Sequence, residues 1–339
     1  MPTSKDVARL AGVSQSTVSY VMSGTRPISE KTRKRVEEAM AQLSFHPNAG
    51  ARALASRRSQ VIGLAMPISE PLSGWSVEFI SVLAVTARQY DYDILLVTDA
   101  EGLQGLKRVV GQQLVDGLII VQVESNDARV PVILDLPVPS VLVGLPEDTK
   151  GLECVDGDFE LAGAICVREL AELGHKSVTL VDWMDTAVGH TVNYVTRFRR
   201  GAEKAAAATG TRITHDPGPD TIAGMEQVVT KALDEAAGIP AFISADYRNQ
   251  DLLLHALRNL GLVLGEDVSV IAYCSDRLAE RQPIPLTNVT YDSVEVYRRA
   301  VQMIVGNLTD PKSRPYEALE LIRPVLKRRN STIRQRDQR

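Results

Sequence analysis

The sequence predicts an all-α unit at the N-terminus, followed by a larger α/β body built on parallel sheets. Residues 1–47 combine helix-capping residues with apolar positions at helical spacing. From Val61 onward, short apolar runs alternate with helical patterns, which is typical of parallel sheets buried on both faces. The 339 residues are too many for one compact core and enough for two or three domains.

The first helix is predicted to begin after Thr3. Thr3 and Asp6 have the spacing of a capping box, in which each side chain satisfies a free backbone N–H group at the helix start. Apolar residues at helical spacing follow at Val7, Leu10 and Ala11. Gly12 then ends the helix, because glycine readily adopts the left-handed conformation of a C-cap.

Two further helices are predicted before residue 47. Ser14 caps the second helix, which Gly24 closes, and Ser29 caps the third, which Pro47 stops. The inward positions are Val18, Val21 and Met22 in the second helix and Val36, Ala39, Met40 and Leu43 in the third.

The outward face of the second helix carries short or planar polar side chains at Gln15, Ser16, Ser19 and Tyr20. Such side chains near a helix N-terminus are able to contact base edges or phosphates in the DNA major groove. Thr17 and the N-terminal amides suit phosphate contacts. These residues alone are equally compatible with a small three-helix bundle that has a polar surface.

Residues 48–60 form a stretch rich in Ala and Arg, in which Leu54 is the only large apolar side chain. The stretch has helical propensity but no apolar face with which to pack. By itself it is therefore predicted to be a disordered linker.

The α/β body is predicted to contain about eight strands in two doubly wound lobes that divide near Gly157. The apolar runs are residues 61–66, 94–97, 118–121, 141–143, 178–181, 241–244 and 268–273. The helical patterns between them include residues 77–88, 160–173, 198–209, 225–237 and 251–260.

The charge is unevenly distributed, although the net charge is only −4. Residues 1–58 hold ten basic and four acidic residues, and residues 327–339 hold six basic residues and one acidic residue. The part between them has a net charge of −15. A basic N-terminal unit on an acidic body indicates that this unit meets a polyanion. The basic C-terminal segment is interpreted as a frayed, solvated end.

Several classes of protein are excluded. No stretch approaches the length of a membrane helix, and the N-terminus has no apolar signal-peptide run. The three cysteines make no disulfide framework, so a cytoplasmic protein is expected. Nucleotide-binding, metalloprotease and hydrolase motifs are absent, and the five histidines have no metal-ligand spacing. We therefore expect no enzyme, cofactor or metal.

The N-terminal segment resembles the LacI/GalR family of bacterial transcriptional regulators. The resemblance is carried by T-x-x-D-V-A-x-x-A-G-V-S-x-x-T-V-S from Thr3 to Ser19 and continues without a gap through Leu54. Further family landmarks are Val115–Ile119, Leu173-Gly174-His175, Gly265–Val270, Pro285-Leu286-Thr287 and Asn330-Ser331-Thr332. The resemblance implies a helix-turn-helix headpiece and a two-lobe effector domain like that of periplasmic sugar-binding proteins.

The resemblance also implies a repressor that binds a palindromic double-stranded DNA operator as a homodimer. Base contacts are expected from Gln15, Ser16, Tyr20, Arg26 and Leu54, and backbone contacts from Ser14, Thr17, Ser19, Phe45 and Asn48. Phe45 departs from the Tyr that is usual in the family and loses a hydroxyl-to-phosphate contact. In such proteins the linker folds on DNA into a hinge helix, and Leu54 would wedge into the minor groove.

The implied domains are a headpiece (1–47), a hinge (48–60), an effector and dimerisation domain (61–332) and a tail (333–339). The first lobe would comprise 61–157 and 288–320, and the second 158–287 and 321–332. A small-molecule effector, a carbohydrate or nucleoside, would bind between the lobes at the carboxyl ends of the strands. The effector-site candidates are Ser69, Trp75, Gln122, Trp183, His190, Tyr194, Phe198, Asp246, Cys274 and Asp276.

Three departures from the family pattern affect this site. Phe198 stands where an Arg is common, Ala245 where an Asn is common, and Cys274 where an Asp is common. A sugar in such a site would leave hydroxyl groups unpaired, which is costly on burial. The alternatives are a less polar effector, a shifted guanidinium from Arg197 or Arg199, or a regulator with no small-molecule effector. Such a regulator would be controlled by a partner protein or be constitutive. A transporter's solute-binding protein is disfavoured by the headpiece.

Overall fold

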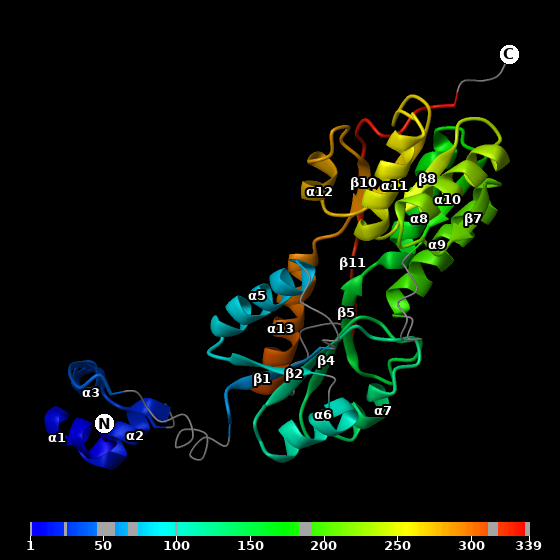
Figure 1. The fold of residues 1–339 in the computed structure, drawn as a ribbon. Coiled ribbons are helices and arrows are strands. Elements are labelled where there is room, and N and C mark those ends of the chain that lie inside the picture. The colour runs from blue at the N-terminus through cyan, green and yellow to red at the C-terminus, as the bar shows by residue number, and fades with distance from the viewer. Residues whose placement is uncertain are drawn as a thin grey trace.

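The computed structural model describes residues 2–23, 26–45, 58–66, 74–98, 101–182, 192–310 and 318–335. Three short helices form the N-terminal unit, and two α/β lobes form the body (Figure 1). The N-terminal unit lies at one end of the molecule, beside the first lobe, and the second lobe lies at the other end. The predicted fold class is therefore confirmed.

The headpiece contains α1 (Ser4–Ala11), α2 (Gln15–Ser23) and α3 (Glu30–Gln42). The predicted caps are present: Thr3 and Asp6 form the capping box, and the Ser14 and Ser29 hydroxyls accept hydrogen bonds from the third backbone N–H beyond them. The core consists of Val7, Ala8, Ala11, Val18, Val36 and Ala39. Leu10 is instead 48% exposed, because Ala8 takes the inward position on this short helix.

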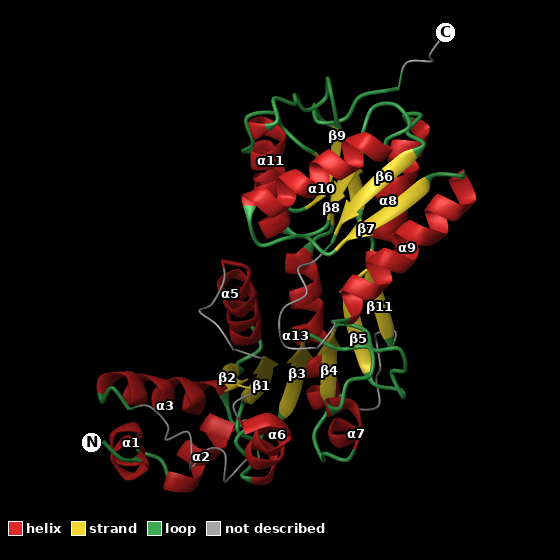
Figure 2. Cartoon of the chain, turned by 45° about the vertical axis from the view of Figure 1, so that its right-hand side comes forward, coloured by secondary structure: helices red, strands yellow, loops and turns green. Residues whose placement is uncertain are grey.

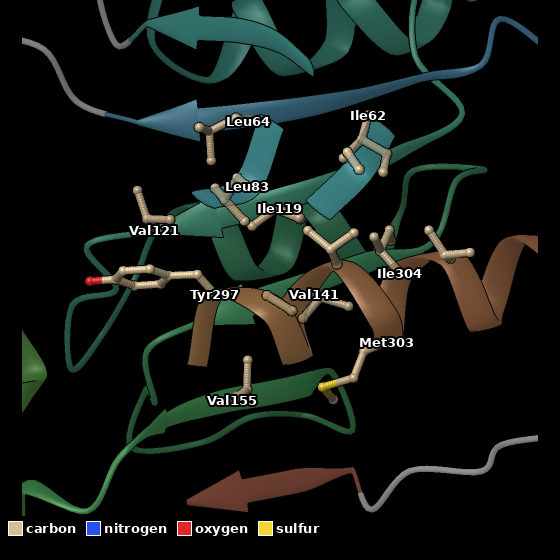
Figure 3. Packing of buried hydrophobic residues seen from close by; sticks show 14 of the residues in the cluster. Ile62, Leu64, Leu83, Ile119, Val121, Val141, Val155, Tyr297, Met303 and Ile304 are labelled. Carbon is tan, nitrogen blue, oxygen red and sulfur yellow. The ribbon is translucent and has the colours of Figure 1, made fainter. Parts of the chain in front are cut away.

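The first lobe is a six-stranded parallel sheet with the order β11-β5-β4-β3-β1-β2. Its strands are β1 (Val61–Met66), β2 (Asp93–Thr98), β3 (Gly117–Val121), β4 (Ser140–Val143), β5 (Glu153–Gly157) and β11 (Leu319–Ile322). The helices α5 (Gly74–Arg88) and α13 (Ser293–Thr309) cover one face, and α6 (Gly102–Gly111) and α7 (Arg129–Leu134) cover the other. Figure 3 shows how α13 contributes Tyr297, Met303 and Ile304 to this core.

The second lobe is a six-stranded sheet with the order β12-β10-β9-β8-β6-β7, in which only β12 is antiparallel to its neighbour. Its strands are β6 (Ser177–Val181), β7 (Arg212–Asp216), β8 (Ala241–Ser244), β9 (Ser269–Tyr273), β10 (Thr287–Thr290) and β12 (Val325–Lys327). The helices α8 (Phe159–Glu172) and α9 (Asn193–Thr209) cover one face, and α10 (Ile222–Glu235) and α11 (Tyr247–Asn259) cover the other. The short α12 (Asp276–Glu280) follows β9. Figure 2 shows both sheets flanked by helices.

Helices α8 and α9 pack so closely that two glycines are required. A Cβ on Gly163 would lie 2.2 Å from the carbonyl oxygen of Phe198, and one on Gly201 would lie 1.8 Å from that of Glu160. Both obstacles are backbone atoms, so neither can move without displacing a helix. This packing fixes the start of α9 beside the crossover from β5.

Three crossovers connect the lobes, after β5, after β10 and between β11 and β12. The first follows Gly157, the last residue of β5. The other two differ slightly from the predicted boundaries, because residues 288–290 pair within the second sheet and residues 321–322 within the first. Neither β10 nor β11 is a continuous apolar run, so the apolar pattern of the sequence did not indicate where these two strands end.

All seven apolar runs lie in strands, but the estimate of about eight strands was too low. The additional described strands are β5, β7, β10, β11 and β12. Strands β7, β11 and β12 lie at sheet edges and mix exposed with partly buried residues, so they have no apolar run.

The basic C-terminal segment is docked on the second lobe. Arg328 binds the buried Glu169 through two hydrogen bonds, and Arg329 contacts Asp276 and Glu280. Lys327 also pairs with Asp276. The interpretation as a frayed, solvated end is therefore wrong for the part that reaches residue 335, because these cations neutralise carboxylates of the lobe itself.

Candidate nucleic-acid interface and interlobe site

A group of hydroxyls surrounds the N-terminus of α2. Ser14 Oγ accepts a hydrogen bond from the Thr17 amide at 3.1 Å and lies 2.7 Å from Ser16 Oγ and 2.8 Å from Thr17 Oγ1. Ser14 and Ser16 are exposed. Hydroxyl donors at a helix N-terminus, where the helix dipole is positive, form an arrangement suited to an anionic phosphate.

The predicted outward face of α2 is outward in the structure. Val18 is fully buried, whereas Gln15 and Ser19 are exposed and Tyr20 is half-buried. The Gln15 side-chain amide donates to Ser4 Oγ at 2.8 Å, so α1 holds this side chain at the start of α2. Arg26 lies over the Tyr20 ring, with 5.0 Å between Cζ and the ring centroid.

The cations of the headpiece differ in what they contact. Arg9 pairs with Asp6 on α1, and hydrogen bonds from Thr3 together with Arg9 hold the pKa of Asp6 below its usual value. Arg35 donates to the carbonyl oxygens of Ala11 and Gly12, which ties α3 to the turn before α2. Arg9 and Arg35 thus bind groups of the headpiece itself.

Phe45 packs against the headpiece core, and its backbone amide donates to the Met40 carbonyl at 2.9 Å. Its ring offers van der Waals contact but no hydrogen bond to a phosphate. Asn48 and Leu54 lie outside the described residues.

In the body, strand order reverses between β1 and β3 and between β6 and β8. Open α/β sheets bind ligands beyond the carboxyl ends of strands at such points. Gln122 directly follows β3, and Asp246 follows β8. Ser69, Trp183 and His190 lie outside the described residues, and only the backbone of Trp75 is described, in α5.

Asn193, at the start of α9, joins the two lobes. Its backbone amide donates to the Val123 carbonyl at 3.0 Å, and its side chain accepts from Ser125 Oγ at 2.8 Å and donates to the Leu145 carbonyl. Asn193 is buried. The segments after β3 and β4 therefore contact the second lobe directly. Nothing in the sequence pattern distinguished this residue.

A buried ion pair also connects the lobes. Arg197 Nη1 lies 2.6 Å from Asp156 Oδ2, and Nη2 donates to the Gly157 carbonyl at 3.1 Å. The Arg197 side chain is only 2% exposed. Burial raises the pKa of Asp156 to about 6, although the Arg197 charge opposes this rise. Arg197 was one of the two arginines whose guanidinium could replace the Arg that is common in the effector site of the family. In the structure this guanidinium is bound to Asp156.

Aromatic rings surround this ion pair. Phe159 lies 5.0 Å from Tyr194 and 5.5 Å from both Tyr273 and Tyr291, measured between ring centroids. The guanidinium carbon of Arg197 lies 5.8 Å from the centre of the Phe159 ring. Tyr194, an effector-site candidate, is therefore part of an aromatic cluster at the crossovers.

The remaining effector-site candidates do not form a polar group around one point. Phe198 is fully buried against Tyr273. Burial raises the pKa of the Cys274 thiol to about 12, which keeps it neutral. Asp276 is partly buried, yet hydrogen bonds from Lys327, Asn288 and Arg329 hold its pKa below the usual value. Asp276 is thus engaged in anchoring the C-terminal segment.

Two family models match the two parts of the chain. Residues 3–48 match the model of bacterial regulatory proteins of the lacI family, and residues 167–332 match the model of the periplasmic binding protein-like domain. The N-terminal unit thus matches the lacI family of bacterial regulatory proteins. The curated relatives that match most of the chain are regulatory proteins.

Two curated LacI-family relatives match over most of the chain. Catabolite control protein A of Priestia megaterium is 27% identical over 88% of this chain and 90% of its own length. The HTH-type transcriptional regulator CelR of Thermobifida fusca is 28% identical over 93% of this chain and 94% of its own length.

Two solved structures share the LacI-family fold. The Lac repressor dimer bound to operator and an anti-inducer has a TM-score of 0.79 and 24% identity, and covers 98% of this chain and 99% of its own. A CelR–cellobiose complex has a TM-score of 0.66 and 25% identity. The match covers 98% of this chain and 100% of the chain in that structure.

The structure also explains two of the sequence landmarks given above for the body. The buried His175 ring lies 3.0 Å from the Ile239 carbonyl and 3.1 Å from the Ile333 carbonyl, and Ser331 Oγ donates to the Val270 carbonyl. Both landmarks thus hold the C-terminal segment. Within the described ranges, no helix combines the length and apolar character needed to cross a bilayer, and no cluster of metal-binding side chains occurs.

Proposed function

We propose that this regulator is a repressor whose α2 helix reads a palindromic operator from the major groove. The observation that carries the proposal is the outward face of α2, where hydroxyls and an amide lie beside the helix N-terminus. The proposed base contacts are Gln15, Ser16, Tyr20, Arg26 and Leu54, and the proposed backbone contacts are Ser14, Thr17, Ser19, Phe45 and Asn48.

We further propose that the protein acts as a homodimer through α5 and β2. Val77 and Val85 lie two turns apart on one face of α5 and are 52% and 64% exposed. Leu96 is 38% exposed on β2, the edge strand that α5 contacts. An apolar patch of this kind at a sheet edge supports a self-complementary interface. Two headpieces would then meet two half-sites of a palindrome.

The DNA proposal is tested by selecting binding sites from random duplexes with the full-length protein. The expected result is a near-palindromic site whose sequence preference changes in Gln15→Ala. Gln42→Ala is the matched control, because Gln42 is exposed on α3 outside the proposed interface. Leu54→Ala should weaken operator affinity, and an unchanged affinity would refute the proposed wedge. Val85→Glu should convert a dimer to a monomer in sedimentation.

We propose that a carbohydrate or nucleoside between the lobes controls operator binding. The proposed site comprises Ser69, Trp75, Gln122, Trp183, His190, Tyr194, Phe198, Asp246, Cys274 and Asp276. The position of Gln122 and Asp246 at the two strand-order reversals supports this, and so does the cellobiose in the complex of a CelR regulator. Only an effector with different affinities for two lobe arrangements can shift the equilibrium between them.

The alternative is a regulator with no small-molecule effector, controlled by a partner protein or constitutive. The burial of Phe198 and the engagement of Asp276 with Lys327 and Arg329 favour it, because they remove polar groups that would hold a sugar. A thermal-shift screen of sugars, nucleosides and polyols separates the two, since a ligand that binds the folded state raises its melting temperature. A complete absence of shifts favours the alternative.

A further inference from the structure

Helix α9 belongs to the second lobe, yet its first turn is held by the first lobe. The first backbone N–H groups of a helix have no partner within the helix. At α9 the Asn193 amide donates to the Val123 carbonyl at 3.0 Å, so a group of the first lobe satisfies one of them. The preceding residue, Val192, forms an isolated antiparallel bridge with Glu124. The first lobe thus caps a helix of the second lobe.

The Asn193 side chain strengthens this connection. Its Oδ1 accepts from Ser125 Oγ at 2.8 Å, and its Nδ2 donates to the Leu145 carbonyl. Asn193 is only 2% exposed, so loss of a partner would leave a buried polar group unsatisfied, which is costly. One side chain therefore joins α9 to the segments that follow β3 and β4.

Two further residues on the same face of α9 contact the first lobe. Asn193, Arg197 and Arg200 are spaced four and three residues apart, which places them on one side of the helix. Arg197 binds Asp156 in the buried ion pair described above. Arg200 Nη1 lies 3.5 Å from Glu147 Oε1 in an exposed pair, which contributes less. The three residues together contact segments at the ends of β3, β4 and β5.

The segment after β3 is built to present its acceptors to α9. Gln122 has a left-handed backbone with a φ of 53°, and Arg129 Nη2 donates to its carbonyl at 2.9 Å. The buried Asp127 carboxylate accepts from the Glu124 amide at 3.2 Å and from the Arg129 amide at 2.9 Å. A segment that is ordered by its own contacts loses little conformational entropy when it binds α9.

We propose that Asn193, Arg197 and Arg200 form a latch, the α9 latch, which holds the two lobes in one arrangement without a ligand. Each of the contacts described above joins groups of this chain, so no small molecule is required to make them. The inference rests on the proposed function, because a repressor occupies its operator until something removes it. The latched arrangement is then the one that binds the operator. A molecule that enters between the lobes must separate these contacts, so it acts as an inducer and not as a corepressor.

The first test is hydrogen exchange of the full-length protein with no added ligand, measured by mass spectrometry on peptides that contain Asn193. Asn193→Ala keeps the backbone amide but removes both side-chain contacts, and Ser125→Ala removes the donor from the first lobe. Each variant should raise the exchange rate of the Asn193 amide roughly 5- to 150-fold. The effect of Ser125→Ala passes from one lobe to the other, which a role of Asn193 confined to α9 would not produce.

Three further variants serve as controls for this measurement. Ser125→Thr retains the hydroxyl and should exchange as wild type does. Asn259→Ala removes an exposed asparagine whose side chain donates to Glu226 within the second lobe, and it should leave the Asn193 amide unchanged. The double variant of Ser125→Ala and Asn193→Ala should exchange no faster than Asn193→Ala alone, because both changes break the same contact.

The second test measures whether the operator favours the latched arrangement. If it does, reciprocity requires that a saturating operator duplex stabilise the latch. In Ser125→Ala the operator selected by wild type should slow exchange of the Asn193 amide at least about 5-fold. A duplex of unrelated sequence should not slow it.

The results that would overturn the proposal differ from those that would contradict the proposed function. Unchanged exchange in both Asn193→Ala and Ser125→Ala would show that these contacts do not hold the lobes together. Exchange that the operator leaves unchanged or accelerates would show that the latched arrangement is not the one that binds DNA. If wild type selects no operator, the proposed function fails, whereas the first test still decides whether the latch exists.

Discussion

The ion pair between Asp156 and Arg197 should be a strong determinant of stability, because it is buried at the junction of the lobes. The two side chains are only 9% and 2% exposed, and 2.6 Å separates Oδ2 from Nη1. Arg197→Met would leave an unpaired buried carboxylate at pH 8, which costs about 3–5 kcal/mol. Asp156→Asn would leave an unpaired buried guanidinium and should cost a similar amount. The double variant should cost clearly less than the sum of the two.

The stability cost of Arg197→Met should increase as the pH rises. Burial raises the pKa of Asp156 from 3.8 in the unfolded chain to about 6 in the folded protein. The contribution of this carboxyl to the free energy of unfolding is therefore fully present below pH 3.8 and is lost as the pH rises through 6. The total loss is about 3 kcal/mol. In Arg197→Met the opposing charge is gone, so the folded pKa rises further and the loss continues to higher pH. The gap between wild type and variant should widen from pH 5 to pH 8.

Urea unfolding followed by far-UV circular dichroism at both pH values measures these differences. Arg108→Met is the matched control, because it breaks the exposed pair with Glu101 and should change stability little. The reasoning is refuted if the penalty of Arg197→Met is the same at pH 5 and pH 8, or if the two single penalties add fully in the double variant.

Three further predictions concern packing, pH and capping. Gly201→Ala should lower the free energy of unfolding by about 3 kcal/mol, because its Cβ would collide with the Glu160 carbonyl; the control Gly111→Ala, in open space at the end of α6, should be neutral or stabilising in the same urea titration. Burial lowers the pKa of His175 below 6.5 in the folded protein. The contribution of the neutral His175 ring to folding stability is therefore present above pH 6.5 and is lost as the pH falls through the folded pKa. The stability of His175→Gln should fall less than that of wild type on acidification, and an equal fall would contradict this. Ser29→Ala should cost about 1 kcal/mol by removing the α3 cap, whereas Ser29→Asp should retain it in thermal melts of the full chain.

The headpiece could be predicted from the sequence because its determinants are local. The caps at Thr3, Ser14 and Ser29 act within three residues, and the inward positions follow from helical spacing. The central strands could be predicted for a similar reason: burial on both faces makes each of them a continuous apolar run. In contrast, α13 was not among the predicted helices, although it provides much of the first lobe's core.

The site between the lobes was less predictable, because it depends on residues far apart in the chain. Asp156 and Arg197 are 41 residues apart, and Asn193 contacts Leu145 from 48 residues away. No spacing rule relates such positions. Likewise, the charges of Arg328 and Arg329 appeared free in the sequence, but Glu169 and Asp276 lie opposite them only once the second lobe is folded.

The three crossovers have a consequence for the order in which the polypeptide folds during synthesis. Strand β11 pairs with the edge of β5, and α13 packs over β3, β4 and β5, yet both are synthesised only after β10 of the second lobe. The emerging first lobe must therefore keep an unpaired strand edge and an uncovered apolar face while β6 to β10 of the second lobe are synthesised. Since chains are made at about 5–20 residues per second, this exposure lasts for roughly 7–27 seconds. The first lobe is thus completed only when α13 and β11 have emerged, and the nascent chain is most prone to aggregation in the interval before this.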